Sequence, residues 1–181
     1  FILAASFLFC LWFSPSIGTP LMERMRDGLH MSKLYIGWLG TIGAIASVAG
    51  SLLFFKWGNK VDMKKWLYIS TILSVVSTYA YLYLTPSSIL IYSIVFGLFG
   101  MITNLAVMSY MARVCVEGVE ASTFALLCSV VNLGGFLSGI VGSRLYDLAG
   151  YNGLVIISGT FTLLCIGFIP FLRIGDTNEK I

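Results

Sequence analysis

The side chains of this chain that could bind a solute are mostly uncharged. Asn104 and Asn132 each lie in a long apolar stretch, and Ser129 precedes the second asparagine by three positions. An amide donates and accepts hydrogen bonds at once, so these residues can hold a polar solute without transferring a proton. A buried asparagine can equally hydrogen-bond to a neighbouring helix, and a methionine such as Met108 can simply fill a core. Both interpretations stay open from the sequence.

Charged residues and histidine, which could perform acid–base or metal chemistry, avoid the apolar parts of the chain. A nucleophile needs a base or a metal within hydrogen-bond reach, and no such pair is found there. The four cysteines form no C-x-x-C pair, and the one histidine stands apart from them, so we expect no metal site and no cofactor. The sequence therefore predicts that the chain is not an enzyme. Six stretches contain no Asp, Glu, Lys, Arg or His: 1–22, 34–55, 66–84, 88–112, 121–143 and 152–172.

Each of these stretches is long enough to cross the hydrocarbon core of a bilayer, which needs about 20 apolar residues. The composition agrees, because 58% of the residues are hydrophobic and only 10% are charged. Backbone groups in lipid must pair within the segment, so such runs fold as helices. The sequence predicts an all-α, multi-pass membrane protein with six transmembrane helices in one bundle over 1–181. The net charge of +3 gives no indication of a nucleic-acid partner.

Orientation follows from the distribution of Lys and Arg in the connections. The connections expected on one side of the bilayer carry four of these residues. Those on the other side, which include 56–65, 113–120 and the C-terminal tail, carry seven. We therefore expect both ends of the segment in the cytoplasm, in a plasma membrane or an organelle envelope. The chain begins inside a hydrophobic segment, as a fragment of a longer protein would.

The first predicted helix is interrupted by Ser14–Pro20, which contains two prolines and a glycine. Proline removes a backbone donor, and an interrupted membrane helix is a pointer to the binding site of a transporter. A plain kink packed against a neighbouring helix is the alternative. We expect a substrate cavity whose wall is formed by Trp12, Pro15, Ser16, Thr19, Asn104, Met108, Ser129 and Asn132.

Small residues recur at three- and four-residue spacing in the helices 34–55 and 121–143, which predicts that both are tightly packed. Two similar segments follow these helices. Gly58 precedes Asp62 in the first, and Gly142 precedes Arg144 and Asp147 in the second, with the two glycines 84 residues apart. Three predicted helices separate these points, which places them on opposite sides of the membrane. The spacing indicates an inverted 3+3 repeat, the arrangement that secondary transporters use for alternating access. Chance similarity of short turns is the alternative.

The segment 112–135 carries a more specific pattern. Ala112-Arg113-Val114-Cys115 is followed by Glu117-Gly118-Val119-Glu120-Ala121-Ser122, by Phe124-Ala125-Leu126-Leu127, and by Ser129 and Asn132. This resembles the junction between the tenth and eleventh helices of the folate-biopterin transporter family, a branch of the major facilitator superfamily. Val116 replaces a usual proline and Ser122 a common threonine. Leu11-Trp12 with Pro15 is similar to the seventh helix of that family.

The resemblance implies the C-terminal half of a major-facilitator-type fold, whose partner is a missing N-terminal six-helix half. It implies a folate or biopterin as the small-molecule substrate and proton coupling, as in a symporter. The connection with Gly58, Asp62, Lys64 and Lys65 resembles a loop of the superfamily that holds helix ends together. We assign it to a cytoplasmic gate together with Arg113 and Glu120. Two alternatives remain, a superfamily transporter of an unrelated small solute and a non-transporting six-helix membrane subunit.

Overall fold

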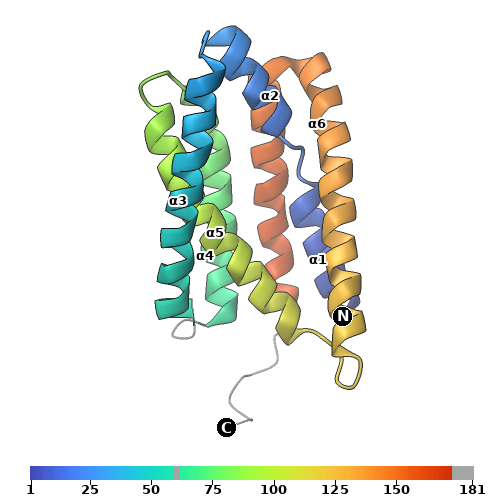
Figure 1. Ribbon diagram of the computed structural model, residues 1–181. Helices are drawn as coiled ribbons and strands as arrows, with labels where there is room; N and C mark the ends of the chain where they lie inside the picture. The colour runs from blue at the N-terminus through green and yellow to red at the C-terminus, as the bar shows by residue number, and fades with distance from the viewer. Residues whose placement is uncertain (59–61, 173–181) are drawn as a thin grey trace.

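The computed structural model describes residues 1–58 and 62–172, and regular structure in these residues is helical. The helices pack lengthwise into one bundle (Figure 1). Short π- and 3₁₀-helical segments (η) extend three of the α-helices. In chain order the elements are α1 (Ile2–Phe13), α2 (Gly18–Glu23), η1 (Arg24–Gly28), α3 (Lys33–Trp57), α4 (Met63–Ala80), η3 (Tyr81–Tyr83), α5 (Ile89–Arg113), α6 (Glu120–Cys165) and η4 (Ile166–Phe171).

Four segments of the described chain are long and apolar enough to cross a membrane: Ile2–Gly28, Lys33–Trp57, Ile89–Arg113 and Glu120–Phe171. The last contains 52 residues, and its helix reverses at Gly150, whose φ of 67° is left-handed. The two limbs of α6 on either side of this glycine run antiparallel (Figure 1). The prediction of a helical membrane protein is confirmed. By length and hydropathy the described residues contain four candidate spans, compared with the six predicted.

Polar caps explain where two of the helices begin. The Ser32 hydroxyl accepts the Tyr35 amide at 3.2 Å at the start of α3, and the Asp62 carboxylate accepts the Lys64 amide at 3.4 Å at the start of α4. Such side chains satisfy amides that have no partner inside the helix. Asp62 thus acts as a helix cap, while 59–61 in the same connection lie outside the described residues.

The predicted turn at Gly142, Arg144 and Asp147 is wrong. All three residues lie within the first limb of α6, and the chain reverses further on, at Gly150. A left-handed backbone is open to glycine and costly for other residues, which places the reversal there. Gly142 serves close packing instead, because a Cβ atom at this position would overlap the backbone of Ser16.

Small residues hold two helix pairs close together. In the α3–α5 pair, a Cβ atom on Gly97 would overlap the Gly43 carbonyl, and one on Gly50 would overlap that of Leu98. In the pair formed by α1 and α6, Gly134 lies against the Phe9 carbonyl. Backbones in lipid approach this closely only where side chains are small. The prediction that the helices at 34–55 and 121–143 are tightly packed is therefore confirmed.

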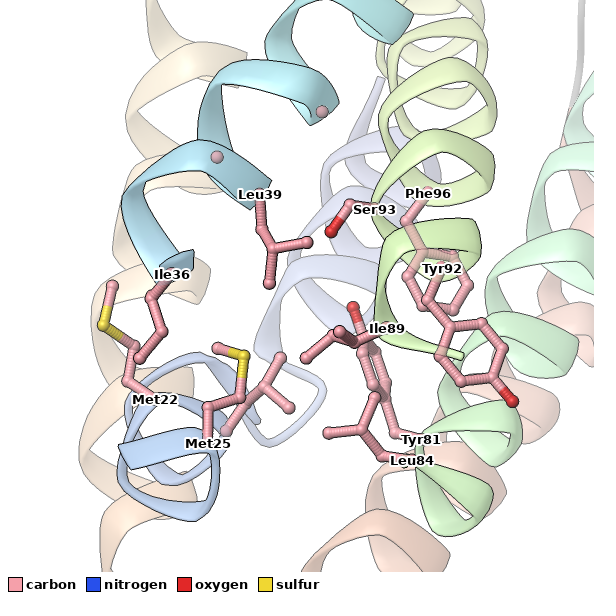
Figure 2. Close-up of a pocket in the computed structure, with 13 residues that line it drawn as sticks. Met22, Met25, Ile36, Leu39, Tyr81, Leu84, Ile89, Tyr92, Ser93 and Phe96 are labelled. Atoms are coloured by element: carbon pink, nitrogen blue, oxygen red, sulfur yellow. The ribbon is translucent and has the colours of Figure 1, made fainter. Parts of the chain in front are cut away.

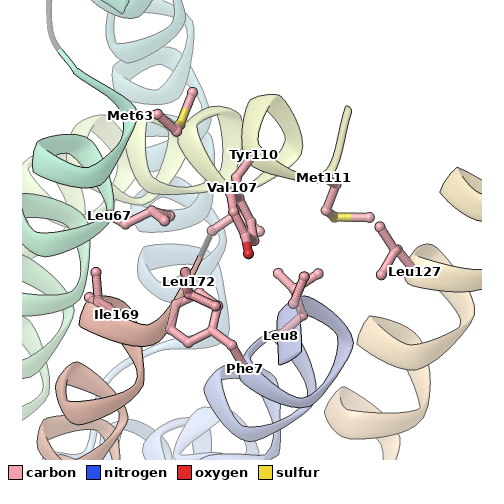
Figure 3. Packing of buried hydrophobic residues seen from close by; sticks show 11 residues of the cluster. Phe7, Leu8, Met63, Leu67, Val107, Tyr110, Met111, Leu127, Ile169 and Leu172 are labelled. Atoms are coloured by element: carbon pink, nitrogen blue, oxygen red, sulfur yellow. The ribbon is translucent and has the colours of Figure 1, made fainter. Parts of the chain in front are cut away.

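The largest apolar core lies toward the end of the bundle that holds the N-terminus (Figures 1 and 3). Phe7 and Tyr110 meet edge to face there, with ring centroids 6.1 Å apart, and Leu8 and Leu127 are fully buried beside them. Met63, Leu67, Ile169 and Leu172 complete the cluster from α4, η4 and the segment after η4. This core joins the ends of α1, α4, α5 and α6, and so holds in place the helices that surround the candidate cavity.

Candidate functional site

The predicted interruption of the first helix is present, because α1 ends at Phe13 and α2 begins at Gly18. The first limb of α6 pairs with the backbone of the interruption. The Ser16 amide donates to the Ser138 carbonyl at 3.1 Å, and the Ser138 hydroxyl donates to the Ser14 carbonyl. Polar backbone groups at membrane depth are tolerated when they pair in this way.

The second limb of α6 binds the same interruption through hydroxyl groups. The Ser14 hydroxyl lies 3.2 Å from that of Ser158 and 2.8 Å from that of Thr162. It also donates to the Ser158 carbonyl at 3.2 Å. The break is therefore held between both limbs of α6, where the Ser14 hydroxyl, the Ser14 carbonyl and the Ser16 amide have protein partners.

A cavity of about 460 Å³ opens between α1, α5 and the first limb of α6, and we call it the main cavity. The structure brings four residues predicted from the sequence together around it: Trp12, Asn104, Met108 and Asn132. Apolar and small residues form the rest of its wall, namely Val107, Met111, Cys128, Val131 and Gly135. Among the described lining residues there is no charge, so the cavity can bind through stacking, apolar contact and neutral hydrogen bonds.

The two asparagine amides are available to a ligand. Within residues 1–58 and 62–172, neither Asn104 nor Asn132 makes a side-chain hydrogen bond. An amide that spans neighbouring helices would be paired, so the interhelical interpretation is not what the structure shows for these two residues. Both amides instead border the main cavity, on α5 and α6 respectively.

A second hollow of about 200 Å³, the side pocket, shares Trp12, Asn104 and Val107 with the main cavity. It continues between α1, α4, α5 and the second limb of α6. Sequence reasoning missed its hydroxyl lining, because serine and threonine in membrane helices usually bond to their own backbone and carry little signal. The remaining lining residues are Leu11, Thr71, Ser74, Gly100, Thr103 and Thr162.

The other predicted cavity residues lie elsewhere. Pro15 is buried and Ser16 pairs with α6, both within the interruption. Thr19 is exposed near the start of α2, and Ser129 is exposed on α6, where its hydroxyl donates to the Ala125 carbonyl at 3.0 Å. None of these four lines the main cavity or the side pocket in the described structure.

The predicted gate residues gather where α5 passes into α6 and where α3 passes into α4. The Glu120 carboxylate accepts the Gly118 amide at 2.9 Å, and Arg113 is the last residue of α5. In the other connection, the Trp66 indole donates to the Gly58 carbonyl at 3.2 Å. Lys64 and Lys65 lie in the first turn of α4.

An apolar pocket of about 240 Å³ lies at the opposite end of the bundle from the large core (Figure 2). Tyr92 and Phe96 stack there with ring centroids 5.5 Å apart. The ring centroid of Tyr81 lies 4.7 Å from that of Phe96. The Arg24 guanidinium lies 4.9 Å from the centre of the Tyr151 ring, whose hydroxyl donates to the Tyr81 carbonyl. The Arg24 contact fastens η1 to the second limb of α6, and we assign the pocket to packing.

Comparison with known proteins agrees with the resemblance found in the sequence. Residues 2–180 match the Major Facilitator Superfamily. The chain is also 41% identical over 96 residues to a protein named folate-biopterin transporter from Synechocystis sp.. That match covers 49% of this chain and only 19% of the relative. The solved structures contain no significant match.

Proposed function

The chain belongs to the major facilitator superfamily, and from this we propose that it is part of a secondary transporter for folate or pterin-like solutes. Superfamily membership and the apolar helices indicate a multi-pass membrane transporter, a class that is generally distinct from enzymes. The observation that carries the proposed substrate is the main cavity, where Trp12 lies with the unpaired amides of Asn104 and Asn132.

These three side chains suit a flat, polar heterocycle. An indole can stack on an aromatic ring, and amides can pair with the alternating donors and acceptors of a pterin edge. Folate also carries carboxylates, for which the main cavity offers no basic partner among its described residues. We assign that charge partner, and the carboxylate that would carry a coupled proton, to the part of the transporter that precedes this chain.

We place the chain as the C-terminal six-helix half of the transporter, with six spans close to the predicted ranges and an N-terminal half as its partner. Support for an inverted repeat comes from packing. Gly43 and Ser47 on α3 have the same spacing as Gly134 and Ser138 on α6. The Ser47 hydroxyl donates to the Gly97 carbonyl of α5 at 3.0 Å, as the Ser138 hydroxyl donates to that of Ser14.

In this proposal α3 with α5 corresponds to α6 with the broken first helix. Rocking of the two halves about the main cavity would give alternating access. Both ends of the segment lie in the cytoplasm, where Arg113, Glu120, Lys64 and Lys65 form the gate. Contacts made in one state and broken in the other would bias the equilibrium between inward- and outward-facing forms.

Uptake in cells tests the substrate. The full-length gene would be expressed in cells that lack folate and pterin uptake, and accumulation of labelled folate and labelled biopterin would be measured. We expect uptake of at least one of these solutes above the level of cells with an empty vector. Uptake of neither, with normal protein in the membrane, would exclude the proposed substrate class and favour an unrelated solute or a non-transporting subunit.

A further inference from the structure

The side pocket contains three polar side chains that have no partner. Among the described residues, the hydroxyls of Ser74 and Thr103 and the amide of Asn104 make no hydrogen bond, and all three line this pocket. They are partly buried on α4 and α5. Unpaired polar groups at membrane depth are costly, so a ligand or water that pairs with them is stabilised there.

Two further hydroxyls present oxygen atoms to the same space. Thr71 donates to the Leu67 carbonyl at 2.8 Å. Thr162 donates to the Ser158 carbonyl at 3.0 Å and also lies 2.8 Å from the Ser14 hydroxyl, so one of its two lone pairs remains. Because their protons are used in this way, their remaining lone pairs can accept from a ligand. The pocket thus offers both donors and acceptors.

The side pocket has a mouth beside the main cavity. Gly100 lines the pocket one helical turn before Asn104 and is exposed, and a Cβ atom on this glycine would meet no other atom within 4 Å. Trp12 and Asn104 border both hollows. A solute stacked on Trp12 could therefore extend a short substituent past Gly100 into the side pocket.

The lining selects the chemistry of that substituent. The described lining residues include no charged side chain, so a carboxylate would lose its hydration without gaining a counter-ion. An alkyl group would leave Ser74, Thr103 and Asn104 unpaired. A short group with neighbouring hydroxyls both donates and accepts, and it fits a volume of about 200 Å³.

We propose that the side pocket binds the uncharged, hydroxylated side chain of a pterin, so that the transporter prefers hydroxyalkyl pterins to folate. This inference rests on the proposed function, because it requires a pterin ring in the main cavity. Thr103 and Ser74 are then specificity-determining residues, and Gly100 keeps the mouth of the pocket open. Folate, whose side chain is bulky and ends in carboxylates, is the disfavoured substrate.

The test compares uptake of three labelled solutes by the full-length transporter in proteoliposomes: biopterin, which has a dihydroxypropyl side chain, 6-methylpterin and folate. The variants are Thr103→Val, Ser74→Ala and Gly100→Val. Thr41→Val is the matched control, because Thr41 is exposed and its hydroxyl bonds within α3 to the Gly37 carbonyl. Protein in the membrane is quantified for each variant.

We expect wild-type protein to take up biopterin about tenfold better than 6-methylpterin, a preference that corresponds to about 1.4 kcal/mol. The three pocket variants should lose most of this preference while retaining 6-methylpterin uptake, and Thr41→Val should keep it. Equal uptake of biopterin and 6-methylpterin, a preference for folate, or an equal fall for both pterins in the variants would overturn the inference alone. Absence of uptake for all three solutes would overturn the proposed function as well.

Discussion

The Ser138 hydroxyl donates a hydrogen bond to the Ser14 carbonyl, at the point where the first helix is interrupted. Ser138 is buried, and its own carbonyl accepts the amide of Ser16. One residue of α6 therefore holds both sides of the interruption, which keeps α1 and α2 in a fixed relationship beside the main cavity.

Replacing this hydroxyl should destabilise the protein. Ser138→Ala leaves the Ser14 carbonyl unpaired at membrane depth, which we expect to cost about 1 kcal/mol and to lower the midpoint of thermal unfolding. Ser129→Ala is the control, because its exposed hydroxyl bonds only within α6. Unfolding of the purified full-length protein in detergent measures both variants. Equal midpoints for the two would show that the Ser138 bond adds no stability.

Close packing at Gly142 gives a second prediction. Gly142→Ala would place a Cβ atom into the backbone of Ser16, whereas Gly139→Ala, one turn earlier on the same helix, meets no atom within 4 Å. Overpacking of this kind costs about 1–3 kcal/mol. The first variant should therefore unfold at a lower temperature and the second should not. A Gly142→Ala protein as stable as the wild type would contradict the close packing of the interruption on α6.

The reversal at Gly150 predicts which residues share a side of the membrane. Val116, between α5 and α6, and Leu148, just before Gly150, lie at opposite ends of the first limb of α6 and are both exposed. With the four native cysteines replaced, Val116→Cys should react with an impermeant maleimide from the cytoplasm only. Leu148→Cys should react only from the other side. Labelling of both from one side would exclude a single crossing between them.

The two cavity asparagines should be needed for transport but not for folding. Asn104→Ala and Asn132→Ala each remove an amide that has no protein partner, so we expect uptake of a transported pterin to fall about tenfold with normal protein levels. Asn152→Ala is the control, since Asn152 is exposed on the second limb of α6 and lines neither hollow. Unchanged uptake in both cavity variants would show that the two amides do not bind the substrate.

The sequence predicted the features that depend on local chemistry. Apolar length indicated the helical class, and Pro15 indicated the interruption, although Pro20 lies within α2. Asn104 and Asn132 were predicted at a cavity wall, and both border the main cavity. Features that depend on tertiary contact were missed. The residue pattern after Gly142 resembled a turn. A glycine is needed there because the backbone of Ser16, which is distant in the sequence, packs against it.

The side pocket shows the same limit. Thr71 and Ser74 resemble ordinary helix residues, and only the approach of α4 to α5 and α6 places them beside Thr103 and Thr162. Small residues at 34–55 and 121–143 did indicate tight packing, because their spacing repeats within one helix. Which helix each would meet could not be read from that spacing.

Counterflow in proteoliposomes tests the central claim most directly. Purified full-length protein would be reconstituted into vesicles loaded with unlabelled biopterin and diluted into a trace of labelled biopterin. We predict a transient accumulation of label inside the vesicles, because labelled and unlabelled biopterin would share the site beside Trp12. This accumulation should be greatly reduced in the Asn104→Ala variant. The same experiment would be done with folate. If the label only equilibrates for both solutes, as it does in protein-free vesicles, the result would contradict the assignment of this chain to a pterin or folate transporter.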